Sequence, residues 1–192
     1  MTPARPVLFD MDGTLTDSLA IITACFDRTM REEAGVVHEP AFYRRFIGPP
    51  LHDSFAELGV ADPARFVAEY RRRYAETMLD TPLFPGVREL LERLDAAGVP
   101  MVVATSKKEE AARAIVEHLD VSRHFLAVCG ADEVGGRVAK HEMVEDALAV
   151  LAERGIDPAS AVMVGDRKYD VDGAAVHGLP TVLVEWGAAP AE

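Results

Sequence analysis

Residues 7–14 read Val7-Leu8-Phe9-Asp10-Met11-Asp12-Gly13-Thr14. The apolar run before the acid pair is continuous rather than alternating, which is typical of a strand buried on both faces of a parallel sheet. Ligand sites of such sheets lie beyond the carboxyl ends of the strands, so both carboxylates are expected in that crevice. Gly13 lets the backbone turn away sharply after the acid pair. This stretch therefore predicts the first core strand and one part of a functional site.

Further apolar runs follow along the chain, separated by longer segments with apolar residues at helical spacing. The runs lie at 101–104, 125–129, 161–164 and 181–184, and the helical patterns lie at 87–97, 109–119, 142–154 and 170–177. Gly98 and Gly155 follow two of these helices, at the position where a left-handed residue commonly ends a helix. The alternation predicts an α/β fold with a doubly wound, mostly parallel sheet.

One long segment contains no strand candidate. Between residues 17 and 80 only helical patterns occur, punctuated by proline and glycine, at 18–34, 41–46, 51–58 and 63–79. The segment begins directly after the first strand and returns before the second. We therefore expect a core domain formed by residues 1–16 and 81–192, with residues 17–80 inserted as a small helical domain.

Composition narrows the class of protein. The formal net charge of −12 disfavours nucleic acid and anionic membrane surfaces as partners. Cys25 and Cys129 are too few for a disulfide framework and are expected to be reduced thiols. No apolar run approaches the roughly 20 residues of a membrane span, and no signal-peptide pattern precedes the first strand. A cytoplasmic protein that acts on a small molecule is therefore expected.

The acid pair indicates chemistry at phosphorus. With Asp10 and Asp12 one residue apart at a strand end, one carboxylate can act as a nucleophile while the other protonates the leaving oxygen and later activates water. A calcium-binding loop is the first alternative, but it needs further oxygen ligands, a late glutamate and flanking helices. The second alternative is an exposed acidic turn.

Two later positions offer groups for phosphate oxygens. Thr105 and Ser106 follow the second strand, where a hydroxyl can hold a phosphate oxygen or simply cap the next helix. Lys140 opens the helix after the third strand, and it is one of only four lysines beside sixteen arginines. A compact ammonium suits a site in which one point charge balances a carboxylate and a phosphate. The alternative is a solvated lysine, although a helix start disfavours a cation.

The fourth strand is followed by Gly165-Asp166, with Asp170 four residues after the aspartate. On adjacent strands, Asp10 and Asp166 would provide oxygen ligands for a hard octahedral cation such as Mg²⁺. Asp170 either orients these neighbours or caps the next helix. No pair of histidines has the spacing of a zinc site.

Together these four motifs resemble the haloacid dehalogenase-like hydrolase superfamily over nearly the whole chain. Residues 9–15 with Asp17-Ser18 resemble the first motif of that family, and Thr105, Lys140 and Gly165-Asp166 with Asp170 match the other three. The resemblance implies a Rossmann-like sheet of strand order 5-4-1-2-3 with a helical cap inserted after the first strand. The turn at 47–51 and the segment 83–87 resemble the phosphoglycolate phosphatase-like branch, whose members usually continue beyond the fifth strand.

For this sequence the resemblance implies that Asp10 attacks phosphorus and that Asp12 exchanges protons with the leaving group and with water. It further implies a Mg²⁺ ion held by Asp10, the main-chain carbonyl of Asp12 and Asp166, with Asp170 in support. Oxygens of the phosphate would be held by residues of the first three motifs, namely Gly13, Thr14, Thr105, Ser106 and Lys140.

The expected substrate is a small phosphorylated metabolite, of phosphoglycolate, nucleotide or pyrophosphate type, handled by a monomer or homodimer. A phosphomutase on the same scaffold is the nearest alternative, and a phospho-accepting or binding module without turnover is the alternative from another class. Arg44, Arg45 and His52 are candidates for substrate contacts in the inserted domain, although arginines on a helix face are often simply solvated.

Overall fold

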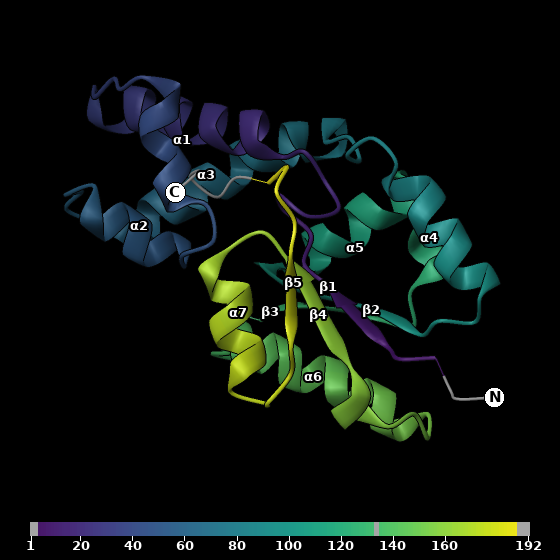
Figure 1. The fold of residues 1–192 in the computed structure, drawn as a ribbon. Coiled ribbons are helices and arrows are strands. Elements are labelled where there is room, and N and C mark those ends of the chain that lie inside the picture. The colour runs from purple at the N-terminus through teal and green to yellow at the C-terminus, as the bar shows by residue number, and fades with distance from the viewer. Residues whose placement is uncertain (1–3, 133–134, 188–192) are drawn as a thin grey trace. The chain divides into compact units, whose positions relative to one another are not determined.

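A computed structural model of the chain describes residues 4–132 and 135–187, which form two compact units. The core unit comprises Met1–Asp17 and Pro82–Glu192, and the helical unit comprises Ser18–Thr81. Figure 1 traces the chain through both units. Along residues 4–132 and 135–187, no helix combines the length and the apolar character that crossing a membrane requires.

The core unit contains one parallel sheet of five strands in the order β3-β2-β1-β4-β5. This arrangement confirms both the doubly wound α/β fold and the expected strand order. The strands are β1 (Val7–Phe9), β2 (Met101–Lys108), β3 (Val128–Ala131), β4 (Val162–Gly165) and β5 (Thr181–Leu183).

The pairing register brings the carboxyl ends of the three central strands together. Phe9 at the end of β1 lies beside Val103 of β2 and Val164 of β4. The main-chain N–H of Asp10 continues this pairing by donating to the carbonyl of Val164 at 2.9 Å. The residues that follow β1, β2 and β4 therefore leave the sheet at one edge.

Helices cover both faces of this sheet, with α6 and α7 on one side and α4 and α5 on the other (Figure 1). Their bounds are α4 (Val87–Ala96), α5 (Glu109–His118), α6 (Lys140–Glu153) and α7 (Lys168–Ala175), and short 3₁₀ turns occupy Ser122–His124 and Pro158–Ser160. Because both faces are covered, the central strands are apolar at nearly every position.

The main apolar cluster lies between the sheet and α6. Leu8, Val102 and Met163 from three strands are fully buried there, together with Met143 and Leu151 of the helix. Burying a large apolar side chain contributes about 1.5–3 kcal/mol, so this cluster fixes the strand ends that carry the polar residues.

Several boundaries differ from the expected ones, and β2, for example, continues to Lys108, four residues beyond its expected end. The third strand begins at Val128 rather than at residue 125, and it includes Gly130, a residue type that rarely indicates a strand. Gly130 is needed because an added Cβ would lie 2.5 Å from the Cα of Glu109. Helices α6 and α7 begin two residues before their expected starts. Glu142 and Asp170 occupy the third helical position, and their carboxylates accept hydrogen bonds from the main chain just ahead.

The helical unit is built around an aromatic cluster. The ring of Phe26 lies 4.9–5.9 Å, between centroids, from the rings of Tyr43, Phe46, Phe55 and Tyr70. Its elements are α1 (Leu19–Ala34), α2 (Leu51–Glu57) and α3 (Pro63–Thr77), with 3₁₀ segments at Pro40–Phe46 and Met78–Asp80. These elements occupy the helical patterns expected for the insertion.

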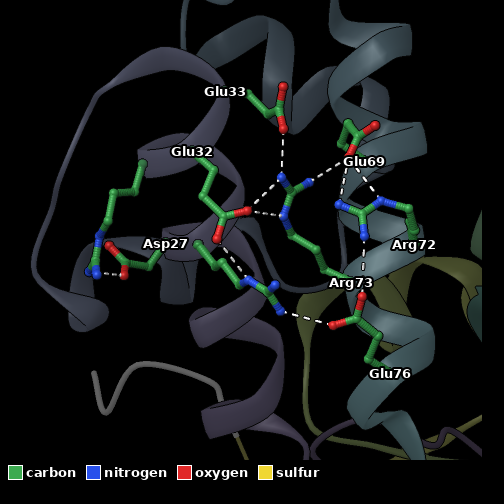
Figure 2. Close-up of polar contacts among 9 residues, drawn as sticks. Asp27, Glu32, Glu33, Glu69, Arg72, Arg73 and Glu76 are labelled. Carbon is green, nitrogen blue, oxygen red and sulfur yellow. Dashed lines mark hydrogen bonds and ion pairs between the residues drawn. The ribbon is translucent and has the colours of Figure 1, made fainter.

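A charged network joins α1 to α3 within the helical unit, as Figure 2 shows. The guanidinium of Arg73 is almost completely buried and pairs with Glu32 and Glu33 of α1 and with Glu69 of its own helix. Because one buried guanidinium contacts carboxylates of both helices, this network fixes how the two long helices pack. We assign it a structural role.

Candidate active site

Three buried carboxylates meet at the carboxyl ends of β1 and β4. Asp10 follows β1, Asp166 follows β4, and Asp170 lies in the first turn of α7. One oxygen of each lies within 4.8 Å of the others, and none of the three residues is more than 8% exposed. Burying carboxylates together is costly unless cations compensate them, so this cluster marks a place where positive charge belongs.

Lys140, the first residue of α6, provides one such charge. Its Nζ lies 2.6 Å from Oδ1 of Asp10 and 2.8 Å from Oδ1 of Asp170. The lysine stem passes Gly173 of α7, where an added Cβ would lie 2.8 Å from Cγ of Lys140. The structure thus places Lys140 inside the cluster rather than in solvent.

Asp170 both caps a helix and pairs with the lysine. Its Oδ2 accepts hydrogen bonds from the main-chain N–H groups of Asp166 at 3.1 Å and of Arg167 at 2.9 Å. Its Oδ1 remains directed at Lys140. The sequence offered capping and orienting as alternatives, and in the structure one carboxylate does both.

The charges of the cluster depend on one another. Burial raises the pKa of Asp10 to about 7; the Lys140 ammonium opposes this shift, while the charges of Asp170 and Asp166 add to it. For Lys140, burial disfavours the charged form, but attraction by Asp10 and Asp170 raises its pKa above the ordinary value. The lysine is therefore cationic, and positive charge beside Asp10 favours its ionised form.

The loop after β1 wraps closely around Asp166. Gly13 has a φ of +88°, and an added Cβ would lie 2.3 Å from Oδ2 of Asp166. The hydroxyl of Thr14 donates to Oδ1 of Asp166 at 3.5 Å. On the other side, a Cβ added to Gly187 would lie 2.3 Å from Cβ of Asp166. Two glycines therefore leave the space that the Asp166 side chain fills.

Trp186 fixes this loop from the C-terminal end of the described chain. Its indole Nε1–H donates to the carbonyl of Thr14 at 3.2 Å, and its ring packs against Phe84 with centroids 6.2 Å apart. Trp186 was not among the residues predicted from the sequence. A lone tryptophan three residues beyond an edge strand carries no pattern that identifies such a contact.

Asp12 has a different partner from Asp10. Its Oδ2 lies 2.9 Å from Nζ of Lys107, and its buried Oδ1 has no hydrogen-bond partner among the described residues. Lys107 is a second residue that the sequence analysis missed. It lies two positions after Thr105, in the part of β2 where the pairing with β3 is irregular, so regular alternation along the strand does not mark it as a site residue.

The remaining candidates belong to β2 or to the helical unit. Thr105 is 1% exposed, and its hydroxyl accepts from the main-chain N–H of Lys107 at 3.3 Å, which leaves the O–H free to donate. Ser106 is partly exposed. Arg44, Arg45 and His52 belong to the helical unit; there, Arg45 stacks on two phenylalanine rings, and His52 is exposed beside Asp53.

Comparison with known proteins identifies the family. A model described as haloacid dehalogenase-like hydrolase matches residues 7–184. The chain is 40% identical to the tyrosine-protein kinase PtkA of Mycobacterium tuberculosis, over 97% of this chain and 64% of that protein. It is 36% identical to a 5'-nucleotidase of Pseudomonas aeruginosa, over 94% of this chain and 82% of that one.

A solved structure shows the same fold. A haloacid dehalogenase-like hydrolase from Streptococcus pneumoniae superposes with a TM-score of 0.87 at 30% identity, covering 98% of this chain and 88% of that one. The chain spans less than two thirds of the length of the mycobacterial relative. The family match, the sheet order and the positions of the four motifs agree: the chain belongs to the haloacid dehalogenase-like hydrolase family.

Proposed function

We propose that the protein is a Mg²⁺-dependent phosphatase that hydrolyses a small phosphomonoester through an aspartyl-phosphate on Asp10. The observation that carries the proposal is the buried Asp10 carboxylate, held by Lys140 at 2.6 Å at the end of β1, with a second carboxylate two residues further on. A nucleophile needs to be held in one geometry, and an adjacent acid–base group completes the pair.

The reaction proceeds in two displacements. An oxygen of Asp10 forms a bond to phosphorus as the bond to the leaving oxygen breaks, and Asp12 gives its proton to that oxygen. A water molecule then forms a bond to phosphorus as the bond to Asp10 breaks, and Asp12 takes the proton of the water back. General acid–base catalysis of this kind contributes about 10²–10⁴-fold to the rate.

Mg²⁺ fits the charge and the ligands of the cluster. Three buried carboxylates face one ammonium there, which leaves negative charge for a divalent cation to balance. Asp10, Asp166 and the main-chain carbonyl of Asp12 would hold the ion, since Mg²⁺ prefers oxygen ligands. When bound, it would neutralise charge on the phosphoryl group during transfer.

The phosphate oxygens are assigned to donors around the cluster. Lys140 supplies a fixed charge, and the Thr105 hydroxyl has its proton available to donate. Ser106 and the turn at Gly13 and Thr14 complete the proposed set. The main-chain N–H groups of Gly13 and Thr14 donate within the turn, to the carbonyls of Thr16 and Met11, so we assign these two residues to shaping the phosphate site. In this arrangement catalysis depends mainly on positioning and on compensation of charge.

The metal proposal predicts opposite effects of two cations. In an assay with 4-nitrophenyl phosphate, we expect EDTA to abolish hydrolysis, Mg²⁺ to restore it and Ca²⁺ to inhibit it. Ca²⁺ accepts more ligands at longer distances and can occupy both oxygens of Asp10, which removes the nucleophile. Undiminished hydrolysis after exhaustive chelation would contradict the proposal.

A second prediction concerns Gly13→Ala. The added methyl would lie 2.3 Å from the Asp166 carboxylate and would displace it. We therefore expect kcat at saturating Mg²⁺ to fall and the Mg²⁺ concentration that gives half the maximal rate to rise. Each change should be roughly tenfold or more, as is typical when the groups that position metal ligands are disturbed. Gly98→Ala is the matched control, since Gly98 also has a positive φ but open space around it. Equal effects of the two substitutions on turnover would show that backbone strain, not the contact with Asp166, is responsible.

We further propose that the helical unit selects the leaving group. The cluster residues all belong to the core unit, whereas Arg44, Arg45 and His52 belong to the helical unit. An inserted domain of this kind can supply substrate contacts without a chemical role. The P. aeruginosa relative is named a 5'-nucleotidase, which supports a phosphorylated metabolite such as a nucleotide as the substrate class.

A second candidate function is transfer of the phosphoryl group to a hydroxyl other than that of water. The mycobacterial relative is named a tyrosine-protein kinase, which favours transfer to a hydroxyl group as the second candidate. A phosphomutase would also transfer to a hydroxyl. Hydrolysis of 4-nitrophenyl phosphate in the presence of added alcohols and tyrosine peptides separates the functions: a hydrolase releases inorganic phosphate in equal amount to the phenol, whereas a transferase releases less.

A further inference from the structure

The ion pair between Lys107 and Asp12 is not used by the steps described above. Both side chains are largely buried, with 7% and 15% of their surfaces exposed. A buried ammonium and carboxylate in contact restrain each other strongly, because leaving either alone is costly in a low-dielectric environment. The contact therefore restrains the position of the Asp12 carboxylate, unlike an exposed ion pair on the surface.

The backbone of β2 places Lys107 at this position. The pairing of β2 with β3 is regular at Ala104 and resumes at Lys108, with an irregularity between them. Within the irregular stretch, the N–H of Lys107 donates to the Thr105 hydroxyl. Its carbonyl lies so close to Gly130 that a Cβ there would come within 2.7 Å. Lys107 is thus anchored through its main chain before its side chain reaches Asp12.

The two oxygens of Asp12 are not equivalent. Oδ2 lies 2.9 Å from the lysine Nζ, whereas the buried Oδ1 has no hydrogen-bond partner in residues 4–132 and 135–187. We propose that Lys107 is a positioning residue that holds Oδ2 of Asp12 and leaves Oδ1 as the oxygen that exchanges the proton with the leaving group. This inference rests on the proposed function, in which Asp12 is the general acid and base.

A positioning role predicts a dependence on the leaving group. A 2,4-dinitrophenolate ion is stable enough to depart without a proton, whereas an alkoxide is not, so only alkyl phosphates require Asp12 in the first step. Loss of Lys107 should therefore slow alkyl phosphates selectively. A role in folding alone would slow both substrate types alike.

The test compares kcat/KM for an alkyl phosphate and for 2,4-dinitrophenyl phosphate in four variants. In Lys107→Met we expect the alkyl phosphate to lose about 10–100-fold more than the aryl phosphate, a part of the usual contribution of general acid catalysis. Lys107→Arg keeps the charge and should recover part of that loss. Lys108→Met alters a half-exposed lysine that pairs with Glu110 and should behave as wild type. Asp12→Asn removes the general acid itself and therefore gives the largest expected difference between the loss of kcat/KM for the alkyl phosphate and that for the aryl phosphate.

Each outcome bears on a specific claim. If Asp12→Asn is selective and Lys107→Met slows both substrates equally, the positioning role is wrong while the proposed function stands. If Asp12→Asn itself shows no selectivity, the acid–base assignment fails, and the role of Lys107 fails with it. A rise in KM with unchanged kcat, equal for both substrates, would instead identify Lys107 as a binding residue and overturn the inference. Should Lys107→Met unfold, Lys107→Gln is measured in its place.

Discussion

Asp10→Asn is expected to lower kcat by roughly 10⁴-fold or more, the scale on which loss of a covalent nucleophile acts. An amide cannot form the phosphorylated intermediate, and it also carries no charge for the metal. The geometry should survive, because asparagine has nearly the same shape and Asp170 still pairs with Lys140 at 2.8 Å. The control is Asp172→Asn, which alters an exposed carboxylate of α7 that pairs only on the surface with Lys168.

The same substitution should stabilise the metal-free protein at alkaline pH. The pKa of Asp10 is about 7 in the folded protein, above its ordinary value of 3.8, so folding favours the protonated form. The ionised form of Asp10 therefore lowers the free energy of unfolding. This loss of stability begins as the pH rises above about 4 and is complete above about 7. One pKa unit corresponds to about 1.4 kcal/mol. We therefore expect the free energy of unfolding of the metal-free Asp10→Asn variant to exceed that of the wild type by at least about 1 kcal/mol at pH 8.

Thermal unfolding in EDTA measures this effect. At pH 8 the Tm of Asp10→Asn should exceed that of the wild type, and near pH 4 the difference should vanish. Adding Mg²⁺ at pH 8 should raise the Tm of the wild type more than that of the variant, because the variant lacks one anionic ligand. A variant that is less stable than the wild type at pH 8 in EDTA would show that Lys140 compensates Asp10 fully.

Lys140→Met is expected to have the second largest effect, and it should reduce both stability and turnover. Without the ammonium, the buried carboxylates of Asp10 and Asp170 lose a cation at 2.6 and 2.8 Å. Removing one partner of a buried pair costs about 3–5 kcal/mol, and removing a group that stabilises transition-state charge costs about 10²–10³ in kcat. Methionine keeps the length and volume of the stem that passes Gly173.

The measurement combines thermal unfolding with kcat at saturating Mg²⁺. Lys168→Met is the control, because Lys168 is 81% exposed and its ion pair with Asp172 lies on the surface. Lys140→Arg should also lose turnover, since a planar guanidinium does not reproduce a compact point charge on two carboxylates. Wild-type kcat in a folded Lys140→Met protein would remove Lys140 from the catalytic set.

Much of the core unit could be predicted because its strands are buried on both faces. Continuous apolar runs at β1 and β4 marked the strands, and the carboxylates directly after them marked the site. The third strand was placed too early, because Gly130 is required there by a close approach to α5 that the sequence does not reveal. The early starts of α6 and α7 reflect acidic residues that reach back to cap their own helices.

Site residues that directly follow a predicted strand could be identified from the sequence. Site residues that depend on contacts between segments distant in the sequence could not. Lys107 became recognisable only through the irregular end of β2, which directs its side chain to Asp12. Trp186 contacts the loop at Thr14 from 172 positions away, and no local pattern encodes such a contact. The double role of Asp170 likewise depends on Lys140, which a different helix provides.

The most direct test of the account is chemical trapping of the phosphorylated residue. The wild-type protein is mixed with substrate and Mg²⁺, quenched in acid during turnover, reduced with borohydride and digested for mass spectrometry. Borohydride converts an aspartyl-phosphate to homoserine and leaves free aspartate unchanged. We predict homoserine at position 10 in the wild type, at no other aspartate, and in neither the EDTA control nor Asp10→Asn. Homoserine at Asp12 or Asp166, with Asp10 unmodified during active turnover, would contradict the account.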